Sequence, residues 1–212
     1  MKIELEQVLP EEIEKRSFEI ITQELKGRTF PKEQEMIIKR VIHTTADFDY
    51  ADNLQFSEGA VMKAIEAIKA GANIVTDTQM AKSGINKKSL ARHGGEVYCF
   101  MSDEDVAKEA KELGTTRATA SMNKAARLDK DVIFAIGNAP TALVHLYELI
   151  NEHQITPKLI IGVPVGFVNV VQSKELIMKT DIPYIVAKGR KGGSNVAAAI
   201  CNALLYMINN ER

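Results

Sequence analysis

The sequence predicts an α/β fold: a single domain built on an open, mostly parallel sheet of about five strands, with helices on both faces. Short apolar runs that suit buried strands alternate along the chain with longer amphipathic segments that suit helices. The length of 212 residues suits one domain. The chain shows no internal repeat, low-complexity tract or linker, so we expect one domain over residues 1–212.

The N-terminal quarter predicts two helices followed by a loop. The first helix is expected over 10–26, because Pro10 suits a helix start, acidic residues follow it, and Gly27 suits its end. The second is expected over 31–43. The next segment, 43–56, is polar and aromatic and has neither helical nor strand periodicity. It therefore predicts a structured loop.

The remaining elements alternate between strands and helices. Strands are expected at 73–77, 96–100, 131–136, 159–163 and 183–187. Helices are expected at 58–70, 103–113, 116–128, 140–153, 168–179 and 194–209. Segments 78–84 and 188–193 are expected to be loops.

Composition excludes several classes of protein. The net charge of −1 creates no global field toward nucleic acid or an anionic membrane, so neither is an expected partner. We see no signal peptide and no run near the roughly 18 apolar residues that span a membrane, which predicts a cytoplasmic protein. Cys99 and Cys201 lie in apolar runs without paired Cys or His spacing, which favours buried thiols over a disulfide or a zinc site.

Loops that follow the expected strands are rich in Gly, Pro and small polar residues. Open parallel sheets bind ligands at the carboxyl ends of their strands, where these loops would meet. A plain tight turn explains any single loop equally well, but five such loops at one edge favour a ligand crevice. The loops are 77–79, 101–102, 137–140, 162–166 and 188–193.

The loop at 188–193 predicts an anion site. Lys188, Arg190 and Lys191 supply three cations within four positions, and Gly192 and Gly193 then lead into a helix whose first N–H groups lack internal partners. The pattern does not say which anion is bound. A nucleotide-dependent oxidoreductase or methyltransferase would carry a glycine-rich fingerprint after the first strand, and this chain has none.

His43 is the candidate acid/base residue, because a histidine can donate or accept a proton near neutral pH. A histidine that only caps the end of its helix explains the position at least as well without further context. A metal site with Asp47, Asp49 and Asp52 is a third interpretation, but it lacks a recognised ligand pattern.

Several segments together resemble the precorrin-8X methylmutase family, including its cobalt-precorrin-8 members. The resemblance covers nearly the whole chain, and the set is more specific than any one loop. The matching segments are Arg40-Val41-Ile42-His43 with Asp47-Phe48, the run 75–85, the run 137–143, the run 162–168 with Ser173-Lys174, and the run 188–194.

The resemblance implies an isomerase of cobalamin biosynthesis that moves a methyl group from C-11 to C-12 of precorrin-8X or cobalt-precorrin-8. The product is hydrogenobyrinic or cobyrinic acid. It implies His43 as the acid/base, Arg40 and Ser17 as substrate contacts, and a homodimer with active sites near the subunit interface. No cofactor is implied, although the substrate itself can carry cobalt.

The residue types suit a flat ring rimmed by carboxylates, which needs apolar walls with cations and N–H or O–H donors around the edge. Arg117 is a further candidate cation, but a solvated helix charge explains it equally well. A non-catalytic tetrapyrrole carrier with the same crevice stays open as the alternative. The expected substrate-binding residues are Ser17, Arg40, Thr78, Gln79, Lys82, Ser83, Gly84, Asn138, Arg190, Lys191, Gly192, Gly193 and Ser194.

Overall fold

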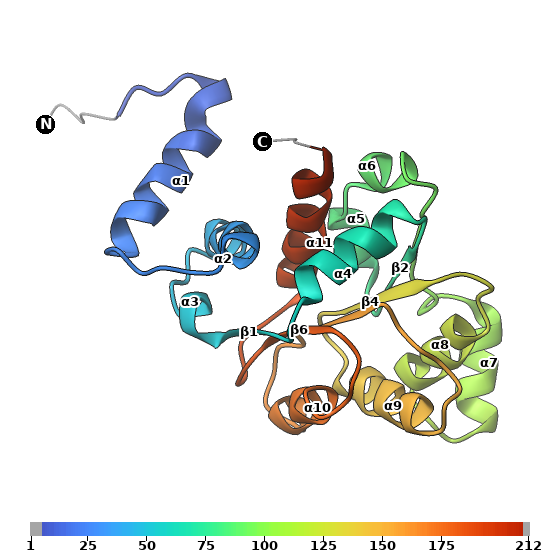
Figure 1. Ribbon diagram of the computed structural model, residues 1–212. Coiled ribbons are helices and arrows are strands. Elements are labelled where there is room, and N and C mark those ends of the chain that lie inside the picture. The colour runs from blue at the N-terminus through green and yellow to red at the C-terminus, as the bar shows by residue number, and fades with distance from the viewer. Residues whose placement is uncertain (1–5, 210–212) are drawn as a thin grey trace, which may run out of the picture.

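A six-stranded sheet in the order β1-β6-β5-β4-β2-β3 forms the centre of the molecule (Figure 1). The structure is a computed structural model and describes residues 6–209. Five strands run parallel, and β1 pairs antiparallel with β6 at one edge. The strands are β1 (Leu54–Phe56), β2 (Asn73–Thr76), β3 (Val97–Tyr98), β4 (Val132–Ile136), β5 (Leu159–Gly162) and β6 (Tyr184–Ala187).

Helices cover both faces of this sheet (Figure 1). One face carries α2 (Lys32–Thr45), α4 (Ala60–Lys69), α5 (Gln79–Gly84), α6 (Lys87–Ala91) and α11 (Ser194–Asn209). The other face carries α7 (Glu104–Glu112), α8 (Arg117–Ala126), α9 (Pro140–Asn151) and α10 (Val170–Ile177). The short helix α3 (Tyr50–Asn53) leads into β1.

Alternation along the strands explains why there are two cores. In β4, Ile133 and Ala135 belong to the core under α2, α4 and α11, whereas Phe134 and Ile136 belong to the core under α7–α10. Successive side chains of a strand point to opposite faces, so a run of five buried residues serves both layers.

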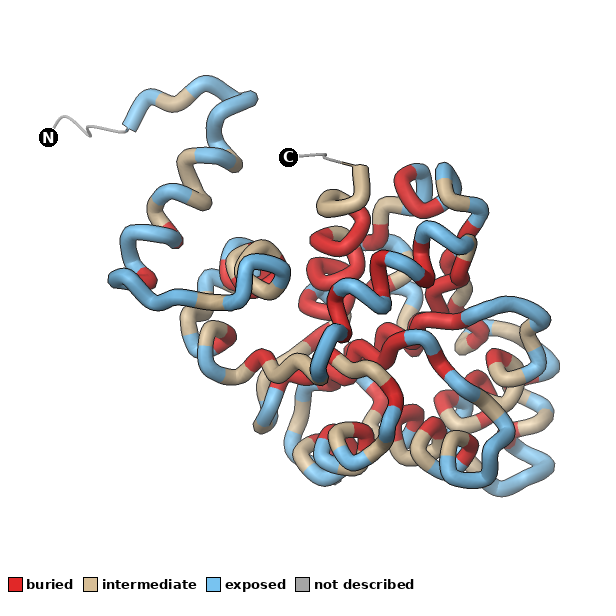
Figure 2. The backbone as a smooth tube through the Cα atoms, in the orientation of Figure 1, coloured by how far each residue is buried: buried red, intermediate tan, exposed pale blue. Residues whose placement is uncertain are grey.

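The N-terminal helices stand apart from the two layers. A 3-10 turn, η1 (Pro10–Glu12), leads into α1 (Ile13–Glu24), which packs on α2 (Figure 1). Figure 2 shows α1 as mostly exposed or half-buried, in contrast to the buried α11. Within α1 only Ile21 is buried, while Ile13 is 54% exposed. This arm is therefore held through a narrow contact.

The expected α/β class with helices on both faces is confirmed, and each of the five expected strands is present. Two local expectations were wrong. Segment 43–56 is not a loop, because α2 continues to Thr45 and α3 and β1 follow. Segment 78–84 is largely the helix α5 rather than a loop, and the helix α6 that follows it was not predicted. The sixth strand, β1, has only three residues and is defined by its pairing with β6, which sequence periodicity cannot reveal.

The order of the strands places a switch point between β2 and β4. From β2 the chain crosses to β3 on one side, and it then returns to β4 on the other side of β2. Crevices of this kind at the carboxyl ends of the strands are where open α/β sheets bind ligands. None of the described helices combines the length and apolar character needed to cross a membrane. Cys99 and Cys201 are buried free thiols.

Candidate active site

Asp77 joins the two strands at the switch point. It follows β2 directly and is 1% exposed. Its carboxylate accepts hydrogen bonds from the backbone N–H groups of Gly137 at 2.8 Å, Asn138 at 2.8 Å and Ala139 at 2.6 Å. Burial raises the pKa of this carboxyl, and the three donors oppose that rise. Asp77 was not among the expected site residues, although its place at a strand end was a usable signal.

Thr78 and Ser194 meet beside Asp77. The Thr78 Oγ1 caps α5 by accepting the Ala81 N–H at 3.1 Å, and it lies 2.8 Å from the Ser194 Oγ. Gly137 allows this approach, because a Cβ there would lie 2.7 Å from the Cα of Ser194. The structure thus brings two of the expected donors together where β2, β4 and the N-terminus of α11 converge.

The loop 188–193 lies on the segment that follows β5. The Gly193 N–H donates to the Val163 carbonyl at 2.8 Å, and the Gly166 N–H donates to the Arg190 carbonyl at 3.2 Å. A Cβ on Gly192 would lie 2.1 Å from the Val163 carbonyl oxygen, so this position requires glycine. The backbone of the expected anion loop is therefore closely packed on its inner side.

A buried lysine holds the same loop. Lys174 of α10 is 1% exposed, and its Nζ donates to the carbonyl oxygens of Gly189 at 2.9 Å and Lys191 at 2.8 Å. Burial lowers the pKa of Lys174 to about 8. From the sequence, Lys174 was named only as part of a matching segment and was given no site role, because a lysine within a helix normally indicates an exposed face.

The charge of Lys191 is paired with two carboxylates, whereas the Arg190 side chain is exposed. Lys191 Nζ lies 2.6 Å from a carboxylate oxygen of both Asp47 and Asp49, which ties the loop to the segment after α2. This pairing lowers the pKa of Asp47 and raises that of Lys191. Arg190 is exposed and its guanidinium lies 5.4 Å from the ring centroid of Phe167, a side chain that is itself 80% exposed.

His43 lies on the exposed side of α2, stacked on a residue of α1. The rings of His43 and Phe18 are nearly parallel, with centroids 5.4 Å apart and an interplanar angle of 19°. Within the described residues, the imidazole nitrogens have no hydrogen-bond partner, so both are available to a ligand. Residues 6–209 also contain no group of three or more metal-ligating side chains, and Asp47 and Asp49 are engaged with Lys191 instead.

Arg40 is buried rather than free. It is 8% exposed and pairs with Glu14 of α1, and its guanidinium carbon lies 4.8 Å from the ring centroid of Phe18 and 5.1 Å from that of Tyr206. Its Nε has no partner among the described residues. Ser17 donates to the Ile13 carbonyl of its own helix at 2.9 Å. Arg40 therefore joins α1, α2 and α11.

A pocket of about 910 Å³ lies between η1, α1 and α2 and reaches Arg40 and Phe18. Its volume falls within the range of about 300–1,000 Å³ that is usual for small-molecule sites. Its other walls carry both signs of charge, from Glu11, Glu14, Lys15, Lys32, Glu35 and Lys39.

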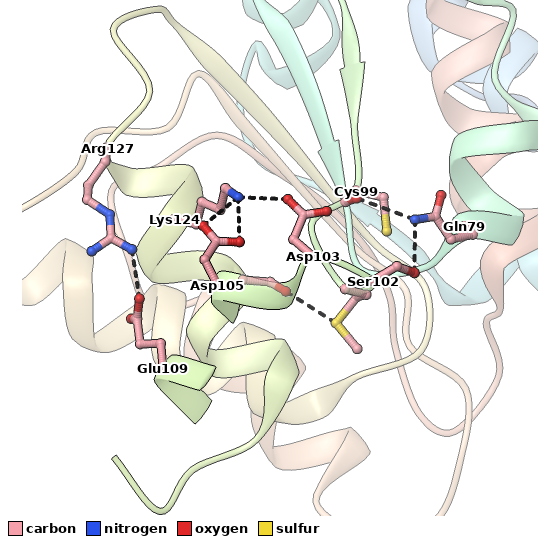
Figure 3. A network of polar contacts seen from close by, with 10 residues as sticks. Gln79, Cys99, Ser102, Asp103, Asp105, Glu109, Lys124 and Arg127 are labelled. Carbon is pink, nitrogen blue, oxygen red and sulfur yellow. Dashed lines mark hydrogen bonds and ion pairs between the residues drawn. The ribbon is translucent and has the colours of Figure 1, made fainter. Parts of the chain in front are cut away.

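The remaining expected residues surround α5. The Gln79 side chain reaches the Cys99 carbonyl and the Ser102 hydroxyl, both at 3.4 Å, beside the ion pairs of Lys124 with Asp103 and Asp105 (Figure 3). Gly84 packs against α11, since a Cβ there would lie 2.9 Å from the Ala198 Cβ. Lys82 is half-buried, and Ser83, Asn138 and Arg117 are exposed.

The expected residues thus form two groups. One surrounds the strand ends and loop 188–193, and the other consists of Ser17, Arg40 and His43 on α1 and α2. Lys191 connects them through Asp47 and Asp49, which follow α2 directly. Together they present an unengaged imidazole, exposed cations and backbone donors, which suits proton transfer to a ligand that carries carboxylates.

Comparison with known proteins identifies the family. The family described as Precorrin-8X methylmutase matches residues 12–207. A cobalt-precorrin-8 methylmutase of Priestia megaterium is 48% identical, with 96% of this chain and 90% of that protein aligned. The protein of the same name from Salmonella typhimurium is 48% identical, with 93% and 95% aligned. A crystal structure of the precorrin-8x methyl mutase of Thermus thermophilus superposes with a TM-score of 0.86 at 38% identity, covering 94% of this chain and 98% of that one. The chain belongs to the precorrin-8X methylmutase family.

Proposed function

We propose that this protein is an isomerase of cobalamin biosynthesis that moves a methyl group from C-11 to C-12 of precorrin-8X or cobalt-precorrin-8. The product is hydrogenobyrinic or cobyrinic acid. The observation that carries the proposal is the 48% identity, over 96% of this chain, with a protein named cobalt-precorrin-8 methylmutase. Because the two relatives of 48% identity compared above carry that name, the cobalt complex is the first substrate to test.

His43 is the proposed acid/base. In the shift, the bond from C-11 to the methyl carbon breaks as the bond to C-12 forms, so the reaction is an isomerisation without oxidation or reduction. The enzyme needs no nucleophile and consumes no cofactor. A proton that His43 donates to a ring nitrogen during the shift and takes back afterwards lowers the barrier and leaves the composition unchanged. His43 can carry this proton because its imidazole is exposed and not engaged by the described residues.

The substrate carboxylates are proposed to meet the cations and donors at the strand ends. Arg190, exposed beside Phe167, offers a charge next to an apolar surface that suits the edge of a flat ring. Arg40 and Lys191 are already paired, so each would exchange a protein carboxylate for one of the substrate. The other proposed contacts are Ser17, Thr78, Gln79, Lys82, Ser83, Gly84, Asn138, Gly192, Gly193 and Ser194.

We propose a cytoplasmic homodimer with each active site near the subunit interface, and no nucleic-acid or membrane partner. The α1 arm supports a dimer, because it carries the Phe18 side of the His43 stack yet buries little of itself in this chain. Leu9, just before η1, and Ile13, at the start of α1, are 60% and 54% exposed, and a second copy would remove these apolar side chains from water.

The test is a visible-absorption assay of the wild type and of His43→Ala with cobalt-precorrin-8 and, separately, precorrin-8X. We expect the wild type to give the corrin spectrum with no change in mass, and His43→Ala to be slower by about a hundredfold or more. His153→Ala, which alters an exposed histidine after α9, is the matched control and should keep full activity. If the wild type binds the ring without converting it, the protein is a tetrapyrrole carrier and the role of His43 is wrong.

A further inference from the structure

The buried ammonium of Lys174 donates to two carbonyl groups and, among the described residues, pairs with no carboxylate. Its described hydrogen bonds go to the Gly189 and Lys191 carbonyl oxygens, at 2.9 and 2.8 Å. Burying a charge of this kind costs free energy, which its hydrogen bonds offset only in part. The cost is reflected in the pKa of Lys174, which burial lowers to about 8. A neutral side chain would fill the same space without that cost, so the contacts themselves require an explanation.

These two contacts set the direction of two peptide groups. In a planar trans peptide the carbonyl and the following N–H point in opposite directions. Because the Gly189 and Lys191 carbonyls point inward to Lys174, the N–H groups of Arg190 and Gly192 point away from it. Among the described residues, none of the amides of 189–192 donates a backbone hydrogen bond, whereas Lys188 donates to Asn53 and Gly193 to Val163. Of these four amides, those of Arg190 and Gly192 have their direction set by Lys174.

We propose that Lys174 is a positioning residue which holds the Arg190 and Gly192 amides outward as a pair of donors for a carboxylate of the macrocycle. The arrangement also removes two carbonyl oxygens from the anion-binding side of the loop, where they would repel a carboxylate. The Arg190 side chain is exposed on that loop and adds its charge to the same place. This inference rests on the proposed function only for the nature of the ligand. The two hydrogen bonds from Lys174 to the loop, called the clamp below, do not depend on it.

The clamp is tested without substrate by hydrogen exchange of segment 188–193 in the wild type and in Lys174→Met. Methionine keeps the length of the side chain and removes the donors. We expect exchange of the Lys188 and Gly193 amides, which donate the backbone hydrogen bonds at the two ends of this segment, to be faster by about tenfold or more. Lys179→Met, which alters an exposed lysine just after α10, is the control and should leave it unchanged. Equal exchange in Lys174→Met and the wild type would overturn the clamp whether or not the protein is a methylmutase.

The role of Lys174 in ligand binding is tested by the kinetics of the variant and by NMR of the wild type. With cobalt-precorrin-8, Lys174→Met should raise KM by about tenfold while kcat stays within about threefold, since the loop binds a carboxylate away from the migrating methyl group. In the ¹⁵N-labelled wild type, metal-free hydrogenobyrinic acid should shift the Arg190 and Gly192 amide resonances. This measurement needs no variant that folds. If the ligand binds and those two amides do not move, the proposal fails while the proposed function stands.

Discussion

Phe18 of α1 and His43 of α2 form a parallel stack, with ring centroids 5.4 Å apart and planes inclined by 19°. The guanidinium of Arg40 lies 4.8 Å from the centroid of the same Phe18 ring, and Arg40 pairs in turn with Glu14. The side chain of the proposed acid/base is therefore positioned by a helix that has few other contacts with the chain. A movement of α1 should therefore change the position of the His43 ring.

Replacing Phe18 by Leu should lower kcat by about two- to tenfold, because an aromatic stack contributes about 0.5–1.5 kcal/mol to holding the imidazole. The His43 Hε1 resonance should move in the same variant as the ring current is lost. Phe30→Leu, which alters another half-buried ring packed against the core, is the matched control. An unchanged His43 resonance in Phe18→Leu would show that the two rings do not stack in solution.

Removing the charge of Glu14 should loosen the arm. Glu14→Gln leaves Arg40, which is 8% exposed, without its carboxylate partner. We expect the free energy of unfolding to fall by about 1–3 kcal/mol, less than for a fully buried pair because Glu14 is partly exposed. Chemical denaturation measures this, and limited proteolysis should cut η1 and α1 faster. Glu11→Gln, an exposed residue of the same pocket, should do neither.

Asp77→Asn should destabilise the junction between β2 and β4. The carboxylate accepts three N–H donors from residues 137–139, whereas an asparagine presents an NH₂ group to at least one of them. We expect the free energy of unfolding to fall by about 2–4 kcal/mol in urea denaturation. Asp129→Asn, which alters an exposed carboxylate before β4, serves as the comparison. Equal stability of the two variants would rule out a structural role for the Asp77 bonds.

Stability should depend on pH through Lys174. Its pKa is lowered from 10.5 to about 8, so between these values the unfolded chain binds more protons than the folded protein. The stability of the wild type relative to Lys174→Met is therefore constant below about pH 8 and rises as the pH increases toward about 10.5, by about 1–3 kcal/mol in total. Urea denaturation of both proteins from pH 7 to about 10.5 measures the difference, in which groups shared by the two proteins cancel. A difference that falls with pH would contradict the prediction.

Most of the α/β framework was predictable from the sequence, because a buried parallel strand and an amphipathic helix leave local patterns. The run 132–136 predicts a strand whatever it pairs with, and the packing on both faces follows from its continuous burial. The loop at 188–193 was predictable for the same reason, since its cations and glycines are adjacent along the chain, and its binding of an anion stays a prediction.

Contacts between distant residues could not be predicted in this way. The strand β1 is defined by residues more than a hundred positions away in β6, and Lys191 meets Asp47 and Asp49 across a similar separation. Lys174 has the sequence pattern of a surface lysine, and only the position of the loop above α10 makes it a buried donor. The stack of Phe18 on His43 likewise requires two helices to meet.

The sequence by itself determined the class of fold, the order of the five parallel strands along the chain, the loop at 188–193 and the family resemblance. Only the tertiary structure decided which cations are free, which are paired, and which residue lies against His43. The physical reason is that hydrophobic periodicity is a property of residues close together in the sequence. Hydrogen bonds and ion pairs between loops instead depend on how the helices and strands pack, because packing decides which loops come into contact.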